Sequence, residues 1–145
     1  MKDRFRFEGL QVWAKAVDIG NSLYDIADEL ESRKLFRFAD QMRGAALSVS
    51  NNIAEGSGST SDREFTQFLN IARRSVFENA NMVIVFAQRG ILSAGQRETL
   101  LDLLNEEAQM ITGLAKSLQR RVSAKLVGLA LLAFCLFGVF CALVT

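Results

Sequence analysis

Histidine and proline are absent from this chain of 145 residues, and its only two cysteines are Cys135 and Cys141. The absence of histidine removes the most frequent general base and the most frequent transition-metal ligand of proteins. The spacing of the cysteines fits neither a zinc site nor a disulfide framework. We therefore interpret them as small apolar residues, with lipidation or a disulfide within a membrane as the alternatives. No cofactor and no metal site is expected.

Recognisable catalytic motifs are also lacking. The sequence shows no carboxylate pair placed for acid–base chemistry and, without histidine, no Ser-His or Cys-His combination. The glycine-rich stretch EGSGST at 55–60 does not follow a predicted strand and lacks the lysine of a phosphate-binding loop. These absences predict that the protein is not an enzyme.

Charge is nearly balanced but unevenly placed along the chain. The 17 basic and 16 acidic residues give a formal net charge of +1, so no large field attracts nucleic acid or a membrane to the whole molecule. Every charged residue precedes Leu126. Any basic surface must therefore come from the arrangement of residues in the first part of the chain.

The uncharged C-terminal segment predicts a transmembrane helix. About 20 apolar residues are enough to cross a bilayer, and positive residues before such a segment favour the cytoplasmic side. We therefore expect a cytoplasmic bundle over residues 1–121 and a transmembrane helix over 122–145, tail-anchored by a single pass in the inner membrane. The residues expected to pack together or form a constriction there are Gly128, Phe134, Phe137, Gly138, Phe140 and Ala142.

Apolar residues recur every three or four positions through the rest of the chain, which predicts helices. Four such runs lie at about 10–30, 34–55, 65–90 and 93–118. The expected fold class is all-α, an up-down-up-down four-helix bundle. Neither glycine nor proline stands between Leu118 and Lys125, so the fourth helix is expected to continue into the C-terminal segment as one rod.

Short polar stretches predict where the helices begin and end. Ser61 with Glu64 has the spacing of a capping box at a helix N-terminus, and the same pattern recurs at 93–96. Gly56 and Gly58 are expected to end the second helix, because glycine adopts the left-handed conformation without steric cost.

Three stretches resemble a known bacterial family. They are LQVWAKA at 10–16, QMRGAALSVSNNIAEG at 41–56 and FTQFLNIARRS at 65–75. In this order they are similar to the four-helix-bundle family of 23S ribosomal RNA intervening-sequence proteins. That family includes the accessory variability determinant proteins of diversity-generating retroelements.

The resemblance implies a four-helix protomer that assembles into a ring-like homo-oligomer, commonly a pentamer. In the retroelement members such a ring binds a reverse transcriptase and nucleic acid through a basic surface. The resemblance therefore implies the same classes of partner for this chain.

Five arginines are the candidate contacts of nucleic acid or of a partner protein. The guanidinium group is a planar fork suited to phosphate, and phosphate contacts supply most non-specific affinity for nucleic acid. Neighbouring acidic residues leave the alternative that these arginines form ion pairs on solvated helix faces. The candidates are Arg37, Arg43, Arg63, Arg73 and Arg74.

A polar cluster is expected where the second helix ends. Asn51, Asn52 and Glu55 occupy its last turn. Glu78, Asn79 and Asn81 of the third helix are expected to complete a buried polar network with them. The cluster either binds a ligand or specifies a neighbouring subunit. The alternative is that these residues cap the helix and hold the glycine loop.

Together these observations predict a membrane-anchored, homo-oligomeric four-helix-bundle scaffold. Its expected partners are copies of itself, the lipid bilayer, a reverse transcriptase or another nucleic-acid-handling protein, and RNA or DNA. One alternative is a membrane-permeabilising effector of a bacterial defence or toxin system, which rearranges its gathered C-terminal segments. The other is an inert structural oligomer.

Overall fold

Four α-helices follow a short 3-10 turn in the computed structural model, which describes the backbone of residues 4–144 and the side chains of residues 4–127. The prediction of an all-α chain with four helices is confirmed for this part of the molecule. The elements are η1 (Arg6–Gly9), α1 (Gln11–Ser32), α2 (Phe36–Ser57), α3 (Asp62–Gln88) and α4 (Ala94–Val144).

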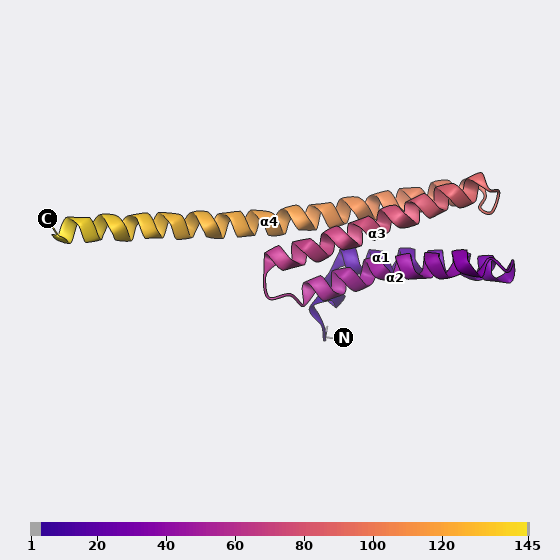
Figure 1. Ribbon diagram of the computed structural model, residues 1–145, viewed down its shortest axis with the longest axis horizontal. Helices are drawn as coiled ribbons and strands as arrows, with labels where there is room; N and C mark the ends of the chain where they lie inside the picture. Colours follow the sequence, from indigo (N-terminus) through magenta and orange to yellow (C-terminus); the bar gives the residue numbers. More distant parts are fainter. Residues whose placement is uncertain (1–3, 145) are drawn as a thin grey trace.

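Consecutive helices pack side by side. Short turns join α1 to α2, α2 to α3 and α3 to α4, so neighbours in sequence are antiparallel neighbours in space (Figure 1). The seam between α1 and α4 is the least extensively packed of the helix–helix contacts. Figure 1 shows that α4 continues as a single helix well past the other three.

A single apolar core lies between the four helices. Each helix contributes one stripe of side chains, as the spacing of apolar residues predicts, and full burial of one aliphatic side chain is worth about 1.5–3 kcal/mol. The fully buried large side chains include Leu23 of α1, Met42 and Ile53 of α2, Leu69 of α3, and Leu104, Ile111 and Leu118 of α4.

Both predicted helix starts are confirmed by their hydrogen bonds. The backbone N–H of Glu64 donates to Oγ of Ser61 at 3.2 Å. At the start of α4, the N–H of Gln96 donates to Oγ of Ser93 at 3.2 Å, while Oε1 of Gln96 accepts from the N–H of Ser93 at 2.9 Å. These bonds satisfy amides that the first helical turn leaves without partners.

The second helix ends at Ser57 with Gly58 as its cap, as predicted, but the predicted left-handed conformation of the glycines is wrong. Gly58 caps the helix with a φ of −80°, in the right-handed region, and Gly56 is still helical. Gly56 is needed for close approach instead, because a Cβ atom there would lie 2.6 Å from Cδ2 of Phe65. The left-handed residues of the described chain are Lys34 and Gly90, with φ of 61° and 68°.

The predicted transmembrane helix is contradicted. Over the residues that the structure describes, no helix is both long enough and apolar enough to cross a bilayer. Among the residues whose side chains the structure describes, α4 carries polar and charged residues as far as Lys125, including Arg120 and Arg121, whereas a crossing helix needs about 20 mainly apolar residues. The single-pass, tail-anchored location in the inner membrane is contradicted by the same finding.

The residues expected to pack or to form a constriction in the C-terminal segment lie outside the described side chains. They are Gly128, Phe134, Phe137, Gly138, Phe140 and Ala142, and the same holds for Cys135 and Cys141.

Candidate interaction surfaces

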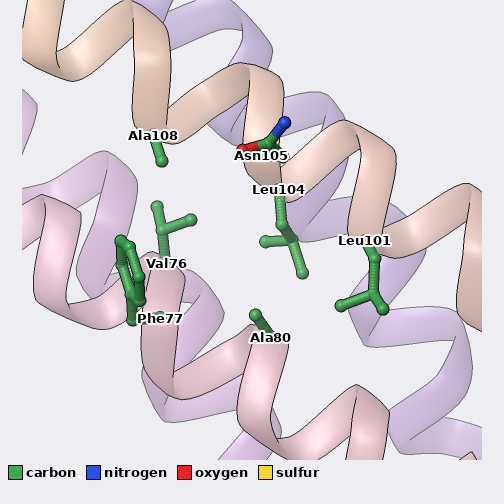
Figure 2. Close-up of a pocket in the computed structure, with 7 residues that line it drawn as sticks. All are labelled: Val76, Phe77, Ala80, Leu101, Leu104, Asn105 and Ala108. Atoms are coloured by element: carbon green, nitrogen blue, oxygen red, sulfur yellow. The ribbon is translucent and has the colours of Figure 1, made fainter.

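A groove runs along the outside of the bundle between α3 and α4. Its apolar part is a hollow of about 170 Å³, and Figure 2 shows the side chains around it, which come from facing turns of the two helices. These turns face each other because the helices are antiparallel, so Ala80 lies near Leu101 and Val76 lies near Leu104 and Ala108. The lining residues are Val76, Phe77, Ala80, Leu101, Leu104, Asn105 and Ala108.

A second, more polar hollow of about 390 Å³ adjoins the first. The two share Phe77, Asn105 and Ala108, so we treat them as one surface and call it the α3–α4 groove. The second hollow adds two cations, Arg73 and Lys116, and no acidic residue lines either hollow. The remaining lining residues of the second hollow are Gln109, Thr112 and Gly113.

Phe77 stands between the apolar and the cationic parts of this groove. Its side chain is 59 % exposed, which is unusual for an aromatic residue on a folded domain. The guanidinium carbon of Arg73 lies 5.2 Å from the centre of its ring, within the range of a cation–π contact. The groove therefore offers an exposed aromatic ring and positive charge at the same place.

A second surface lies on the outer side of α2 and α3. Ile71 and Val85 on α3 are 44 % and 39 % exposed, and we call these two the α2–α3 outer face. Leu47 of α2 is also exposed, but it follows Arg43 by four residues and so lies on the side of α2 that faces α1. Ile71, Glu78 and Val85 are seven residues apart, so they share one side of α3. A hydrogen bond of 2.9 Å from Nε2 of Gln41 to Glu78 places that side beside α2.

The structure separates the five candidate arginines. Arg43 bridges α1 and α2, with Nη2 at 2.5 Å from both Asp28 and Glu31, and hydrogen bonds to Asp28 and then Glu31 raise its pKa above the usual value. It also lies 3.8 Å from Asp40 of its own helix. Arg43 is therefore occupied in holding two helices together, which is the alternative that the sequence left open.

The other four arginines are exposed and lie on different parts of the surface. Within residues 4–127, none of Arg37, Arg63, Arg73 and Arg74 forms an ion pair. Arg37 lies in the first turn of α2, and Arg63 lines a hollow near Lys125. Arg73 belongs to the α3–α4 groove, whereas Arg74 follows Ile71 by three residues and so lies on the side of the α2–α3 outer face.

The predicted polar cluster is only partly brought together. Asn51 and Glu55 are exposed, and Glu78 pairs with Gln41. Asn52 alone turns inward, where Nδ2 donates to the carbonyl oxygen of Ser48 at 2.7 Å and to its Oγ at 3.1 Å.

Sequence reasoning named Asn79 as a member of a buried network but missed Ser48, Ser75 and Glu107. Oγ of Ser48 lies 2.9 Å from Oγ of Ser75, which links α2 to α3, and Nδ2 of Asn79 donates to the carbonyl oxygen of Ser75 at 2.8 Å. Glu107 on α4 is also buried. The available signal was a polar residue inside an apolar stripe, as at Glu107. Among the described residues, no three Asp, Glu or Cys side chains gather as metal ligands.

The fold defines a class of protein, a small four-helix bundle, and exposed apolar side chains lie on its outside. The profile of the family described as 23S rRNA-intervening sequence protein matches residues 8–113, which is more than half of the chain. The chain belongs to this family, and the resemblance of its three motifs is confirmed at that level. The match does not distinguish the accessory variability determinant proteins of retroelements from other members of the family, so a likeness to those proteins stays a prediction. No curated protein matches the chain at a significant level.

Proposed function

We propose that this chain is a non-catalytic scaffold that assembles into a ring-like homo-oligomer, a pentamer in the form that the resemblance implies, and binds nucleic acid or a nucleic-acid-handling protein such as a reverse transcriptase. Family membership supports a small helical, non-enzymatic protein. The observation that carries the proposal further is the presence of two exposed apolar surfaces of different character on α3.

The α2–α3 outer face supports self-association. Exposed aliphatic side chains on one side of a helix are typical of surfaces that contact another protein. Such side chains are removed from water only when a partner covers them. Glu78 beside this face accepts a hydrogen bond of 2.9 Å from Nε2 of Gln41, so one of its carboxylate oxygens keeps a donor when the face is covered.

Replacing Ile71 by glutamate is expected to reduce the mass of the assembly in solution. The substitution adds a charge at the α2–α3 outer face, and a buried charge without a partner opposes association strongly. Light scattering coupled to size exclusion measures the effect. Asn70→Glu is the matched control, because Asn70 is the exposed neighbour in the same helix. The proposal of a homo-oligomer would be contradicted by a monomeric wild-type chain. Contact through the α2–α3 outer face would be contradicted by an equal loss of assembly mass in both variants.

The α3–α4 groove supports binding of single-stranded nucleic acid. Unpaired bases stack on exposed aromatic rings and on guanidinium planes, and lysine and arginine neutralise phosphates. Phe77, Arg73 and Lys116 place these three elements along one groove whose lining holds no acidic residue. A protein partner that carries nucleic acid would meet the same surface.

Phe77→Ala is expected to weaken binding of a single-stranded RNA about tenfold, since stacking of one base is worth about 1–3 kcal/mol. Arg73→Gln is expected to weaken binding and to reduce the slope of log affinity against log salt by about 0.7, the value of one phosphate contact. Fluorescence anisotropy over a range of salt concentrations measures both. Arg43→Gln is the control, because Arg43 is engaged by acidic residues of the bundle. An equal loss of RNA affinity in all three variants would mean that the substitutions destabilise the fold and that Phe77 and Arg73 do not contact RNA.

A further inference from the structure

Two polar side chains are buried in the centre of the bundle without full hydrogen bonding. Glu107 of α4 is 1 % exposed, and Asn79 of α3 is completely buried. Oδ1 of Asn79 and both carboxyl oxygens of Glu107 have no hydrogen-bond partner among the described protein groups. A buried oxygen without a partner destabilises the fold, and a buried carboxylate destabilises it more, so this arrangement needs a physical explanation.

Both side chains line one small internal cavity. The space in it that is open to the centre of a water molecule is about 10 Å³, roughly what one water needs. All four helices enclose it, and its other walls are apolar or lack a side chain. These are Ala16, Ile19, Gly20 and Leu23 of α1, Ala46 and Val49 of α2, Val76 of α3 and Leu104 of α4.

Charged groups act on Glu107 only weakly and from one direction. Lys15 of α1 and Glu106 of α4 are the charged neighbours, and they pair with each other at 2.5 Å. From α2 and α3 no charged residue lines the cavity. Burial raises the pKa of Glu107 to about 8, while Lys15 lowers it and Glu106 raises it by smaller amounts. Lys15 therefore does not neutralise a Glu107 carboxylate.

We propose that Glu107 and Asn79 form a proton-binding and water-binding site in the bundle core, in which protonated Glu107 donates to one internal water and that water donates to Oδ1 of Asn79. With a single proton and a single water, this arrangement gives a partner to Oδ1 of Asn79 and to the protonated oxygen of Glu107, and leaves only the carbonyl oxygen of a neutral carboxyl group without one. An ionised Glu107 would need several donors that the apolar walls do not provide. The proton is therefore part of the folded structure.

Loss of the proton from Glu107 is expected to affect the seam between α1 and α4. The seam is the least extensively packed of the helix contacts, and beyond the cavity it opens into a surface groove next to Ile26, Leu100 and Leu103. When Glu107 loses its proton, water must reach the carboxylate, and we expect the least packed seam, between α1 and α4, to separate for it. The site thus couples proton loss to loosening of the bundle.

The sign of the pH effect follows from the raised pKa. The unfolded chain releases the proton near pH 4.5, the ordinary value, and the folded chain releases it near pH 8. The stabilisation by this proton is complete below about pH 4.5 and is lost as pH rises to about 8. Within this window each pH unit lowers the folding equilibrium constant by up to tenfold.

Denaturant unfolding of the full chain between about pH 5 and pH 9 tests the proposal. The wild type is expected to lose at least a hundredfold in folding equilibrium constant across this range, and Glu107→Gln, which cannot ionise, is expected to lose much less. Asp102→Asn is the matched control, because Asp102 is an exposed carboxylate of the same helix that does not act on Glu107, so this change should leave the wild-type slope intact. Identical pH profiles for the wild type and Glu107→Gln would overturn the proposal.

Two spectroscopic measurements on the wild type test whether Glu107 holds a proton and whether a water lies beside Asn79, even where Glu107→Gln fails to fold. Infrared spectroscopy at pH 7 should show the carbonyl band of a protonated carboxyl group that shifts with 13C-labelled glutamate. NMR should show transfer of magnetisation from a long-lived water to the side-chain amide of Asn79. The lack of the protonated-carboxyl band would overturn the proton site, and the lack of the water signal would overturn the bridge.

Discussion

Alanine in place of Leu104 is expected to lower the free energy of unfolding by about 3 kcal/mol. Leu104 is 2 % exposed and lies between the α3–α4 groove on one side and the internal cavity on the other. Loss of its side chain removes burial energy and leaves a space that the neighbouring helices cannot close, and such changes cost about 2–5 kcal/mol. Chemical denaturation with a two-state fit measures the loss.

Leu101→Ala is the control for this result. Leu101 lines the same groove but is only half-buried, so its truncation should cost clearly less than that of Leu104. A variant at Leu104 that is as stable as the wild type would mean that α3 and α4 do not pack around this residue as described.

Gly56→Ala is expected to destabilise the protein by about 2 kcal/mol, although alanine is normally better than glycine in a helix. A Cβ atom at this position would lie 2.6 Å from Cδ2 of Phe65 and 2.7 Å from Cβ of Phe68. The ring of Phe65 is buried, and the Cβ of Phe68 is attached directly to the backbone, so neither can move aside cheaply. The start of α3 would have to shift away from α2.

Gly44→Ala provides the matched comparison in the same helix. A Cβ atom at Gly44 meets nothing within 4 Å, and the residue is exposed. This change should therefore raise stability by about 0.5–1 kcal/mol, as expected for alanine in a helix interior. Thermal and denaturant unfolding of the two variants should give shifts of opposite sign. Shifts of the same sign and size would contradict the close approach at Gly56.

The proposed self-association and the proposed nucleic-acid binding use two different surfaces of α3. Because α3 is flanked by α2 on one side and α4 on the other, residues one position apart on it serve different surfaces. Arg73 belongs to the α3–α4 groove, whereas Arg74 lies toward the α2–α3 outer face. Variants at Arg73 should therefore affect nucleic-acid binding without changing the mass of the assembly.

The candidate site could be predicted from sequence only in part. The arginines were recognisable as possible phosphate contacts from residue type, but the ion pairs of Arg43 with Asp28 and Glu31 join residues of different helices. Asn52 was recognised, whereas its connection through Ser48 to Ser75 depends on which turns of α2 and α3 face each other. Spacing within one helix does not contain that register.

Three features of the fold could be read from the sequence: the four helices, the capped starts of α3 and α4, and the apolar stripe of each helix. These features depend on neighbours along the chain, through the helical period and local hydrogen bonds. Packing between helices was needed to show that Gly56 serves a close helix approach, that Arg43 pairs with acidic residues of α1, and that Asn79 and Glu107 line one cavity. Each of these depends on distances between residues of different helices, which only packing sets.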